Sequence, residues 1–181
     1  MNRKFSIALL LLLSVSVSCS SVGTEQQATN APSAPSNANA QATPAKALPE
    51  DVVQASAAKV ELQAGKPAQA TVRLVIKEGY HINGNPPSQY QIATLLTVEQ
   101  TDGITAGQPA YPPSISKKFE FSEQPLAVYE KEAMINLPLN ATASATKGER
   151  TLPARLRFQA CDEQVCYPPK NLQVAIPLAV K

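Results

Sequence analysis

Residues 155–178 read RLRFQACDEQVCYPPKNLQVAIPL, and this stretch decides the kind of fold that we expect. Apolar and other side chains alternate on both sides of two closely spaced cysteines. The alternating apolar positions are Leu156 and Phe158 before the cysteines, and Leu172, Val174, Ile176 and Leu178 after them. A period of two is typical of a β-strand with one buried face. The stretch therefore predicts two strands, joined through a short segment that begins and ends with cysteine.

The same pattern continues upstream, where Val72, Leu74 and Ile76 alternate with the residues between them. Further candidate strands cover residues 58–63, 79–83, 92–100, 104–110 and 127–139, and turn signals rich in Gly and Pro separate them. No window shows an amphipathic helical stripe with caps. About seven or eight short strands of this kind predict an all-β chain with an immunoglobulin-like β-sandwich.

The pair Cys161 and Cys166 has two interpretations. A short turn between antiparallel strands would bring the two Cα atoms to a bridging distance of roughly 5.5–6 Å. As a structural staple, the bridge closes a very short loop. It therefore constrains the unfolded chain little and stabilises the folded state by only about 2 kcal/mol. As a redox centre, a short bridge near an exposed sheet edge exchanges readily with an attacking thiolate. The segment Tyr167-Pro168-Pro169 favours the second interpretation, because two prolines cannot continue a ladder and the backbone must leave the sheet.

Two acids, Asp162 and Glu163, lie between the cysteines. A neighbouring negative charge raises the pKa of a thiol and so weakens it as an attacking thiolate. The pair is therefore better suited to being attacked as a disulfide, or to passing on electrons after a partner engages it, than to acting as an independent oxidant.

The N-terminus has the layout of a secretory signal peptide over residues 1–18. Arg3 and Lys4 precede an apolar run that ends at Leu13, which is too short to span a bilayer. Cys19 follows small residues, as in a bacterial lipobox, so we expect it to carry lipid and anchor the chain durably. The alternative is ordinary cleavage nearby that leaves Cys19 as a free thiol. Ser20, the residue after Cys19, favours sorting to the outer membrane. Export from the cytosol would also allow a disulfide to persist.

Residues 19–49 are dominated by small and polar residues, which predicts a disordered, lipid-anchored linker with a reach of about 30 Å. Residues 50–181 form the predicted β-sandwich domain. This domain carries thirteen Lys and Arg residues, sixteen less Arg3, Lys4 and Lys46, and thirteen acids, fourteen less Glu25. Such a balance argues against nucleic acid or an anionic membrane surface as its partner.

Three segments resemble the N-terminal periplasmic domain of DsbD, the thiol–disulfide reductant conductor. CDEQVCYPP, preceded by RLRFQA, is similar to the active-site segment of that family. GYHING at 79–84 resembles its Gly-Tyr-aromatic segment, and KKFEFSEQPLAVYEKE at 117–132 resembles the segment that caps the cysteines. The resemblance covers the chain from about Leu48 onward. It implies an immunoglobulin-like fold, cysteines on neighbouring strands, and electron transfer between thioredoxin-like partners.

The sequence departs from that family in two respects. Enterobacterial members have five residues between the cysteines, whereas this chain has four, which alters the loop. Those members also continue into a membrane-embedded and a thioredoxin-like domain, whereas this sequence stops at Lys181. We therefore expect its electrons to come from a separate membrane electron transporter of the DsbD or CcdA type, or from a thioredoxin-like protein.

The resemblance also implies residue roles. Cys166 matches the attacking cysteine and Cys161 its resolving partner. Phe121 matches the cap aromatic, with Phe119 as the alternative. These two rings would share one face of an extended segment, and plain core packing is the other interpretation of both.

The remaining cap or partner-binding candidates are Glu120, Tyr80, His81 and Tyr167. Glu120 could hold the thiols protonated, or could be a solvated acid. His81 could relay a proton at neutral pH, although a single histidine is more often a surface residue. A metal site formed by His81 and the cysteines is a weaker idea.

The sequence therefore predicts an exported carrier of electrons by thiol–disulfide exchange, a component of a protein-disulfide reductase system, with no cofactor and no metal. The main alternative is a lipoprotein binding or assembly module whose disulfide is purely structural. A third hypothesis is a copper or zinc carrier that binds metal in its reduced form.

Overall fold

The computed structural model describes residues 47–99, 101 and 103–181, and every regular element among them is a β-strand. The predicted all-β, immunoglobulin-like class is confirmed. The predicted signal peptide, Cys19 and nearly all of the predicted linker lie outside the described residues. No helix in the described part of the chain is long and apolar enough to cross a membrane.

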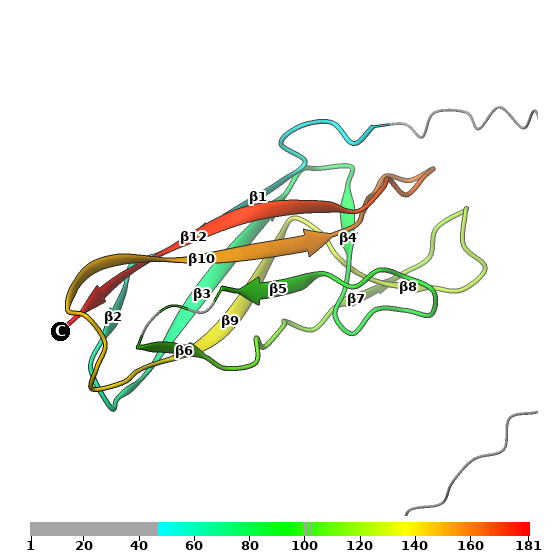
Figure 1. Ribbon diagram of the computed structural model, residues 1–181. Coiled ribbons are helices and arrows are strands. Elements are labelled where there is room, and N and C mark those ends of the chain that lie inside the picture. Colours follow the sequence, from blue (N-terminus) through cyan, green and yellow to red (C-terminus); the bar gives the residue numbers. More distant parts are fainter. Residues whose placement is uncertain (1–46, 100, 102) are drawn as a thin grey trace, which may run out of the picture. The chain divides into compact units, whose positions relative to one another are not determined.

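Two four-stranded sheets form the layers of the sandwich (Figure 1). The first sheet has the order β1 (Val53–Ala57), β3 (Pro67–Ile76), β9 (Glu132–Ala141) and β6 (Ile104–Ala106). The second has the order β2 (Val60–Leu62), β12 (Lys170–Val180), β10 (Gly148–Phe158) and β5 (Leu95–Val98). Neighbouring strands are antiparallel except β2 and β12, which are parallel.

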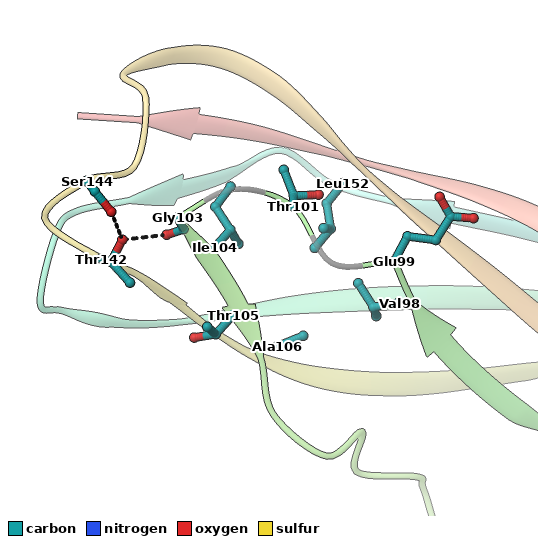
Figure 2. A pocket seen from close by; sticks show the side chains of 10 residues that line it. All are labelled: Val98, Glu99, Thr101, Gly103, Ile104, Thr105, Ala106, Thr142, Ser144 and Leu152. Atoms are coloured by element: carbon teal, nitrogen blue, oxygen red, sulfur yellow. Dashed lines mark hydrogen bonds between the residues drawn. The ribbon is translucent and has the colours of Figure 1, made fainter.

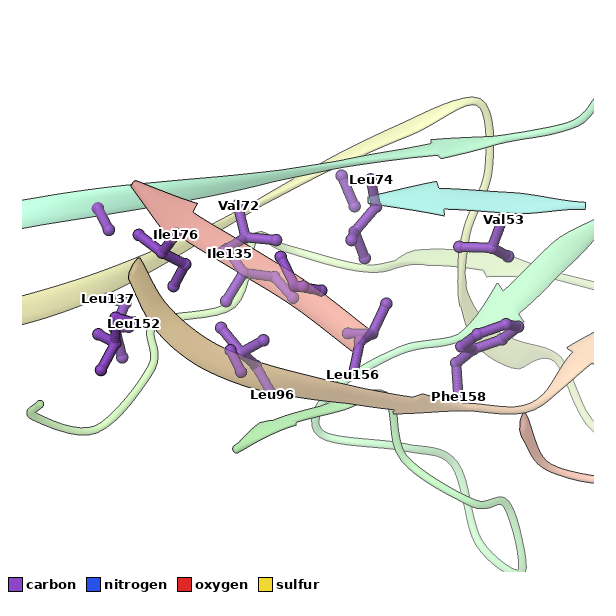
Figure 3. Close-up of a cluster of buried hydrophobic side chains, with 14 of the residues drawn as sticks. Val53, Val72, Leu74, Leu96, Ile135, Leu137, Leu152, Leu156, Phe158 and Ile176 are labelled. Atoms are coloured by element: carbon purple, nitrogen blue, oxygen red, sulfur yellow. The ribbon is translucent and has the colours of Figure 1, made fainter. Parts of the chain in front are cut away.

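The core lies between these layers and is built by the alternation seen in the sequence. In β10, Leu156 and Phe158 are buried, whereas Arg155 and Arg157 are exposed. Figure 3 shows side chains from both sheets meeting in this space. The labelled examples include Val72, Leu74, Ile135, Leu156 and Ile176. A period of two places alternate side chains on the same face of a strand, and that face is buried here. The strands predicted from the alternating segments are therefore confirmed.

A third, smaller sheet has the order β11 (Ala160–Cys161), β4 (His81–Asn83), β8 (Leu126–Tyr129) and β7 (Ile115–Lys117). Its strands are continuations of the main layers: β4 follows β3, β8 precedes β9, and β11 follows β10. Figure 1 shows β4, β7 and β8 at the same end of the sandwich as the connection from β10 to β12. The third sheet therefore gathers strand ends from both layers, and one of the cysteines is part of it.

The predicted strand at 127–139 is in fact two strands, β8 and β9. They are separated at Lys131, whose positive φ of 61° is uncommon for a residue other than glycine. The carbonyl oxygen of Lys131 accepts a hydrogen bond from the Ile76 amide at 2.8 Å, which holds this kink against β3. The kink passes the chain from the third sheet to the first, a change of partner that a continuous period-two pattern does not reveal.

Other predicted strands were too long, and two were missed. The structure has strands at 60–62, 81–83, 95–98 and 104–106 in place of the longer predicted ranges. The missed strands are β1, with the sequence VQASA, and β7, with the sequence ISK. Both are short: β1 alternates one valine and two alanines with polar residues, and β7 has a single apolar residue, so neither gives a strong strand signal. The total of twelve strands among the described residues exceeds the predicted seven or eight mainly because of the third sheet.

We expect Leu156→Ala to lower the free energy of unfolding by about 2–5 kcal/mol, because Leu156 is fully buried and its truncation leaves a cavity. The neighbouring Arg155→Ala removes a side chain from the exposed face and should change that free energy by no more than about 0.5 kcal/mol. Urea denaturation of both variants checks the prediction, and equal effects would contradict the assignment of the two faces of β10.

Candidate functional site

Cys161 and Cys166 form a disulfide within a tight hairpin, with their Cα atoms 3.9 Å apart. Backbone hydrogen bonds flank the pair: the Tyr167 amide donates to Ala160 at 2.9 Å, and the Asp162 amide donates to Val165 at 3.0 Å. The cysteines therefore occupy the position between bonded pairs, where opposing Cα atoms approach most closely. The predicted Cα separation of roughly 5.5–6 Å was too long for this reason.

The two sulfur-bearing residues differ in exposure. Cys161 is fully buried, because β11 pairs with β4 at the edge of the core. Cys166 is partly exposed, and Pro168 and Pro169, which follow it before β12 begins, are exposed. A thiolate arriving from solvent therefore meets Cys166 first. The accessible edge that the sequence predicted exists for one cysteine of the pair.

Asp162 organises the hairpin. One of its carboxylate oxygens accepts hydrogen bonds from the backbone amides of Gln164 and Val165, at 2.9 and 2.8 Å. The other accepts a hydrogen bond from the Tyr167 hydroxyl at 2.6 Å. Tyr167 is only 1% exposed and contacts the ring of Tyr80, which is partly buried. Tyr167 therefore holds the hairpin through Asp162 and presents almost no surface of its own.

His81 lies directly opposite Cys161 in the register between β4 and β11. It is 1% exposed, so the expectation of a surface histidine was wrong. Its burial follows from the inner position of β4 in the third sheet and from Phe119, whose ring stacks on the imidazole with centroids 4.1 Å apart. Among the described residues, Nε2 of His81 has no hydrogen-bond partner.

Burial lowers the pKa of His81, because the charged imidazolium loses hydration there. The negative charge of Glu130 opposes this shift most strongly, and the positive charge of Lys117 adds to it. The acids of the hairpin, Glu163 and Asp162, oppose it more weakly. The ring is therefore held neutral at a pH where an exposed histidine would begin to protonate.

The predicted cap residues form a turn instead of the expected extended segment. The Ser122 amide donates to the Phe119 carbonyl at 3.2 Å, and Glu120 lies exposed between the two aromatic residues. The rings of Phe119 and Phe121 still face each other, with centroids 5.2 Å apart. Phe119 is 2% exposed and covers His81, whereas Phe121 is 39% exposed and forms the outer layer. The disulfide, the imidazole and the two phenyl rings thus follow one another from the hairpin to the surface.

Lys117 connects three parts of the site, and sequence reasoning did not single it out. Its Nζ lies 2.7 Å from Glu130 and 3.1 Å from Glu163, and 5.1 Å from the centre of the Phe119 ring. These two hydrogen bonds raise the pKa of Lys117. Because Lys117 lies two residues before Phe119 of the cap turn and Glu163 lies in the hairpin, this ion pair joins the cap to the disulfide loop.

Asn83 is a second residue that sequence reasoning missed. It is fully buried, and its amide nitrogen donates to the Ile92 carbonyl at 3.0 Å and to the Gln159 side chain at 3.1 Å. Gln91 donates to its oxygen at 2.7 Å, and Gln159 in turn donates to the Tyr167 carbonyl at 3.1 Å. A polar residue between apolar strand positions was the available signal. This network links the loop after β4 to the residue that follows Cys166.

A separate cavity of about 600 Å³ has Leu152, in the first half of β10, in its lining (Figure 2). The cysteines follow the other end of that strand. Its lining combines apolar side chains such as Ile104 and Leu152 with hydroxyl groups such as those of Thr142 and Ser144. Among the described residues of this lining, Glu99 is the one that can ionise. The described residues also contain no group of three or more His, Cys, Asp or Glu side chains arranged to hold a metal.

Comparison with known proteins gives a family match over most of the chain. The sequence profile described as "Thiol:disulfide interchange protein DsbD, N-terminal" matches residues 49–177. No curated protein sequence matches the chain.

Among the solved structures that are similar to this chain are two N-terminal domains. The reduced N-terminal domain of DsbD from Neisseria meningitidis is 27% identical, with a TM-score of 0.41, over 59% of this chain and 74% of that one. The N-terminal periplasmic domain of ScsB from Proteus mirabilis is 14% identical, with a TM-score of 0.48, over 74% of this chain and 50% of that one. This chain therefore spans about half the length of the ScsB domain.

We expect the burial of His81 to make stability depend on pH. In the unfolded chain the imidazole has a pKa of about 6.5, and in the folded chain its pKa is lower. The unfolded state therefore binds more protons near and below that value, so stability is full above it and falls as the pH drops. Urea denaturation between pH 7.5 and 5.5 should show this loss in the wild type and a smaller one in His81→Gln. Equal pH dependence in the two proteins would contradict the prediction.

Proposed function

The chain belongs to the family of DsbD N-terminal domains, and from this membership we propose that it carries electrons between exported proteins through Cys161 and Cys166. The family is periplasmic and is associated with thiol–disulfide exchange. The observation that carries the proposal for this chain is the asymmetry of its disulfide. A partly exposed Cys166 is joined to a fully buried Cys161 beside a stack of aromatic rings.

The proposed cycle begins when the thiolate of a reducing partner attacks Sγ of Cys166. The bond between Cys166 and Cys161 breaks, a mixed disulfide forms between the partner and Cys166, and the electron pair goes to the Cys161 sulfur, which takes up a proton. A second thiol of the partner then attacks the mixed disulfide, so that the partner leaves oxidised and this chain holds two thiols. In the second half, Cys166 attacks the disulfide of a downstream protein, and Cys161 restores the internal bond.

The cap would control which thiols reach Cys166. Phe121 and Phe119 stack above His81, Glu120 lies at the surface of the same turn, and Tyr80 supports Tyr167 beneath the hairpin. The ion pair of Lys117 and Glu163 would hold this cap against the disulfide loop until a partner docks. Such an exposed pair contributes only about 0–1 kcal/mol, so the docking of a partner is sufficient to displace it.

Export and anchoring complete the proposal. A signal peptide at 1–18, lipid on Cys19 and a flexible linker over 19–49 would place the domain at 50–181 on the periplasmic side of a membrane, by preference the outer one. A reach of about 30 Å would let the domain meet both reducing and accepting partners. The proposed partners are thioredoxin-like proteins and a membrane electron transporter of the DsbD or CcdA type.

We expect the Cys161–Cys166 pair to have a midpoint reduction potential between roughly −180 and −270 mV, the range of working oxidoreductases. The potential should be measured in a Cys19→Ser background by equilibration against glutathione and thioredoxin buffers, with alkylation to trap the thiols. A pair within this range would justify capture of partners through mixed disulfides with Cys161→Ala.

A Cys161→Ala, Cys166→Ala double variant controls for unspecific alkylation in the same measurement. A pair that stays oxidised well below about −300 mV would contradict the carrier function. It would support the alternative of a binding module with a structural disulfide. In such a module, replacement of the cysteines lowers stability and does not affect any redox activity.

We expect Phe121→Ala to increase the rate at which a small thiol such as dithiothreitol reduces the disulfide, by several-fold, because it removes the exposed outer ring of the cap. Met134→Ala is the matched control, since Met134 is 38% exposed and Phe121 is 39% exposed, but Met134 lies on β9 of the first sheet. Quenched alkylation gives both rates. Identical rates in the two variants would exclude a shielding role for Phe121.

A further inference from the structure

The proposed cycle has one step that the burial of Cys161 makes difficult. When the chain gives its electrons away, Cys166 is joined to the downstream protein, and Cys161 must attack as a thiolate to release it. Cys161 is fully buried, and a thiol with the ordinary pKa of about 8.5 is mostly protonated at neutral pH, so little thiolate exists there without help. The resolving step therefore requires a base beside Cys161.

His81 is in the position for that base. Residues directly opposite each other on paired strands have Cβ atoms about 4.5–5.5 Å apart on the same face of the sheet, and His81 is the register partner of Cys161. Its Nε2 is buried and has no hydrogen-bond partner among the described residues. An unsatisfied buried polar atom is costly and calls for an explanation, and a role in catalysis is one of the few explanations known.

The other candidate bases near His81 are already engaged. The charged groups that act on the imidazole are Glu130, Lys117, Glu163 and Asp162. Glu130 and Glu163 both bind Lys117, and Asp162 accepts hydrogen bonds from two backbone amides and from the Tyr167 hydroxyl. Among these groups, the imidazole of His81 alone combines an unengaged nitrogen with a position opposite Cys161.

We propose that His81 is the general base of the resolving step, with Nε2 accepting the proton of the Cys161 thiol as that sulfur attacks Cys166. This assignment rests on the proposed carrier function. The bond between the two cysteine sulfurs forms, and the bond between Cys166 and the downstream sulfur breaks. The electron pair leaves with the downstream protein as its thiolate, and the imidazolium then releases its proton to solvent.

The surroundings of the ring suit this use. Phe119 stacks on the imidazole at 4.1 Å and covers it, which holds its orientation. Burial disfavours the imidazolium, so the proton is passed on and the ring returns to the neutral state that the next turnover needs. When the chain is reduced instead, Nε2 would first take up a proton from solvent and then pass it to the Cys161 sulfur as that sulfur leaves the disulfide.

The test uses the reduced full chain with Cys19→Ser and an aromatic disulfide, 5,5′-dithiobis(2-nitrobenzoic acid), as the acceptor. Attack by Cys166 releases one equivalent of coloured thiolate, and resolution by Cys161 releases the second. Stopped-flow absorbance separates these phases over a range of pH. His81→Phe keeps a ring that can stack on Phe119, and His81→Gln keeps a polar side chain; neither is a base near neutral pH.

We expect the second phase to slow about 100-fold near pH 7 in both variants, within the usual range for loss of a general base. The difference in the rate of the second phase between the variants and the wild type should shrink at higher pH, because the Cys161 thiol then ionises without a base. In the wild type the second phase should reach its plateau near neutral pH, where His81 is already neutral. That profile is informative even if one variant fails to fold.

Three results would overturn the assignment. Equal slowing of both phases at every pH would show that His81 only positions the hairpin. Two rapid phases in the variants, matching the wild type, would exclude the base while leaving the carrier function intact. A wild-type chain that releases one equivalent or none would remove the resolving step, and the proposed function would fail with it.

Discussion

The pairing of β11 with β4 is the contact on which the rest of the site depends. It buries Cys161, places this residue opposite His81, and leaves Cys166 on the solvent side of the hairpin. The two strands come from different layers, since β4 continues the first sheet and β11 continues the second. The pairing therefore joins the two layers beside the cysteines, and it leaves one sulfur-bearing residue buried while its neighbour is partly exposed.

Buried polar groups around the hairpin are matched almost completely. Asn83 donates to the Gln159 side chain, and Gln159 donates to the Tyr167 carbonyl. The Tyr167 hydroxyl in turn donates to Asp162, so these bonds tie the loop after β4 to the hairpin. A buried polar network is stable only when its members are satisfied. Nε2 of His81 differs from these groups, because it has no hydrogen-bond partner in the part of the chain that the structure describes. An atom left unsatisfied within an otherwise complete network is where a chemical role is most informative to test.

The two acids between the cysteines interact differently in the folded chain from what their positions in the sequence suggest. From the sequence, their charges are expected to act directly on the thiols. In the structure, Asp162 is committed to backbone amides and to Tyr167, and Glu163 is paired with Lys117. The electrostatic environment of the disulfide therefore depends on the strand β7 and the cap as much as on the loop itself, and a shift of the cap would change both access and charge.

The sequence by itself determined the all-β class, the buried faces of the long strands and the cysteine pair, because period-two alternation and residue spacing are local properties. Only the tertiary structure decided the break at Lys131, the short strand β7, the burial of His81 and the choice of Phe119 as the ring that covers it. These features depend on which strands become neighbours. Residues 81, 119 and 161 are far apart along the chain, and their side chains acquire a common environment only when strand ends from both layers meet in the third sheet.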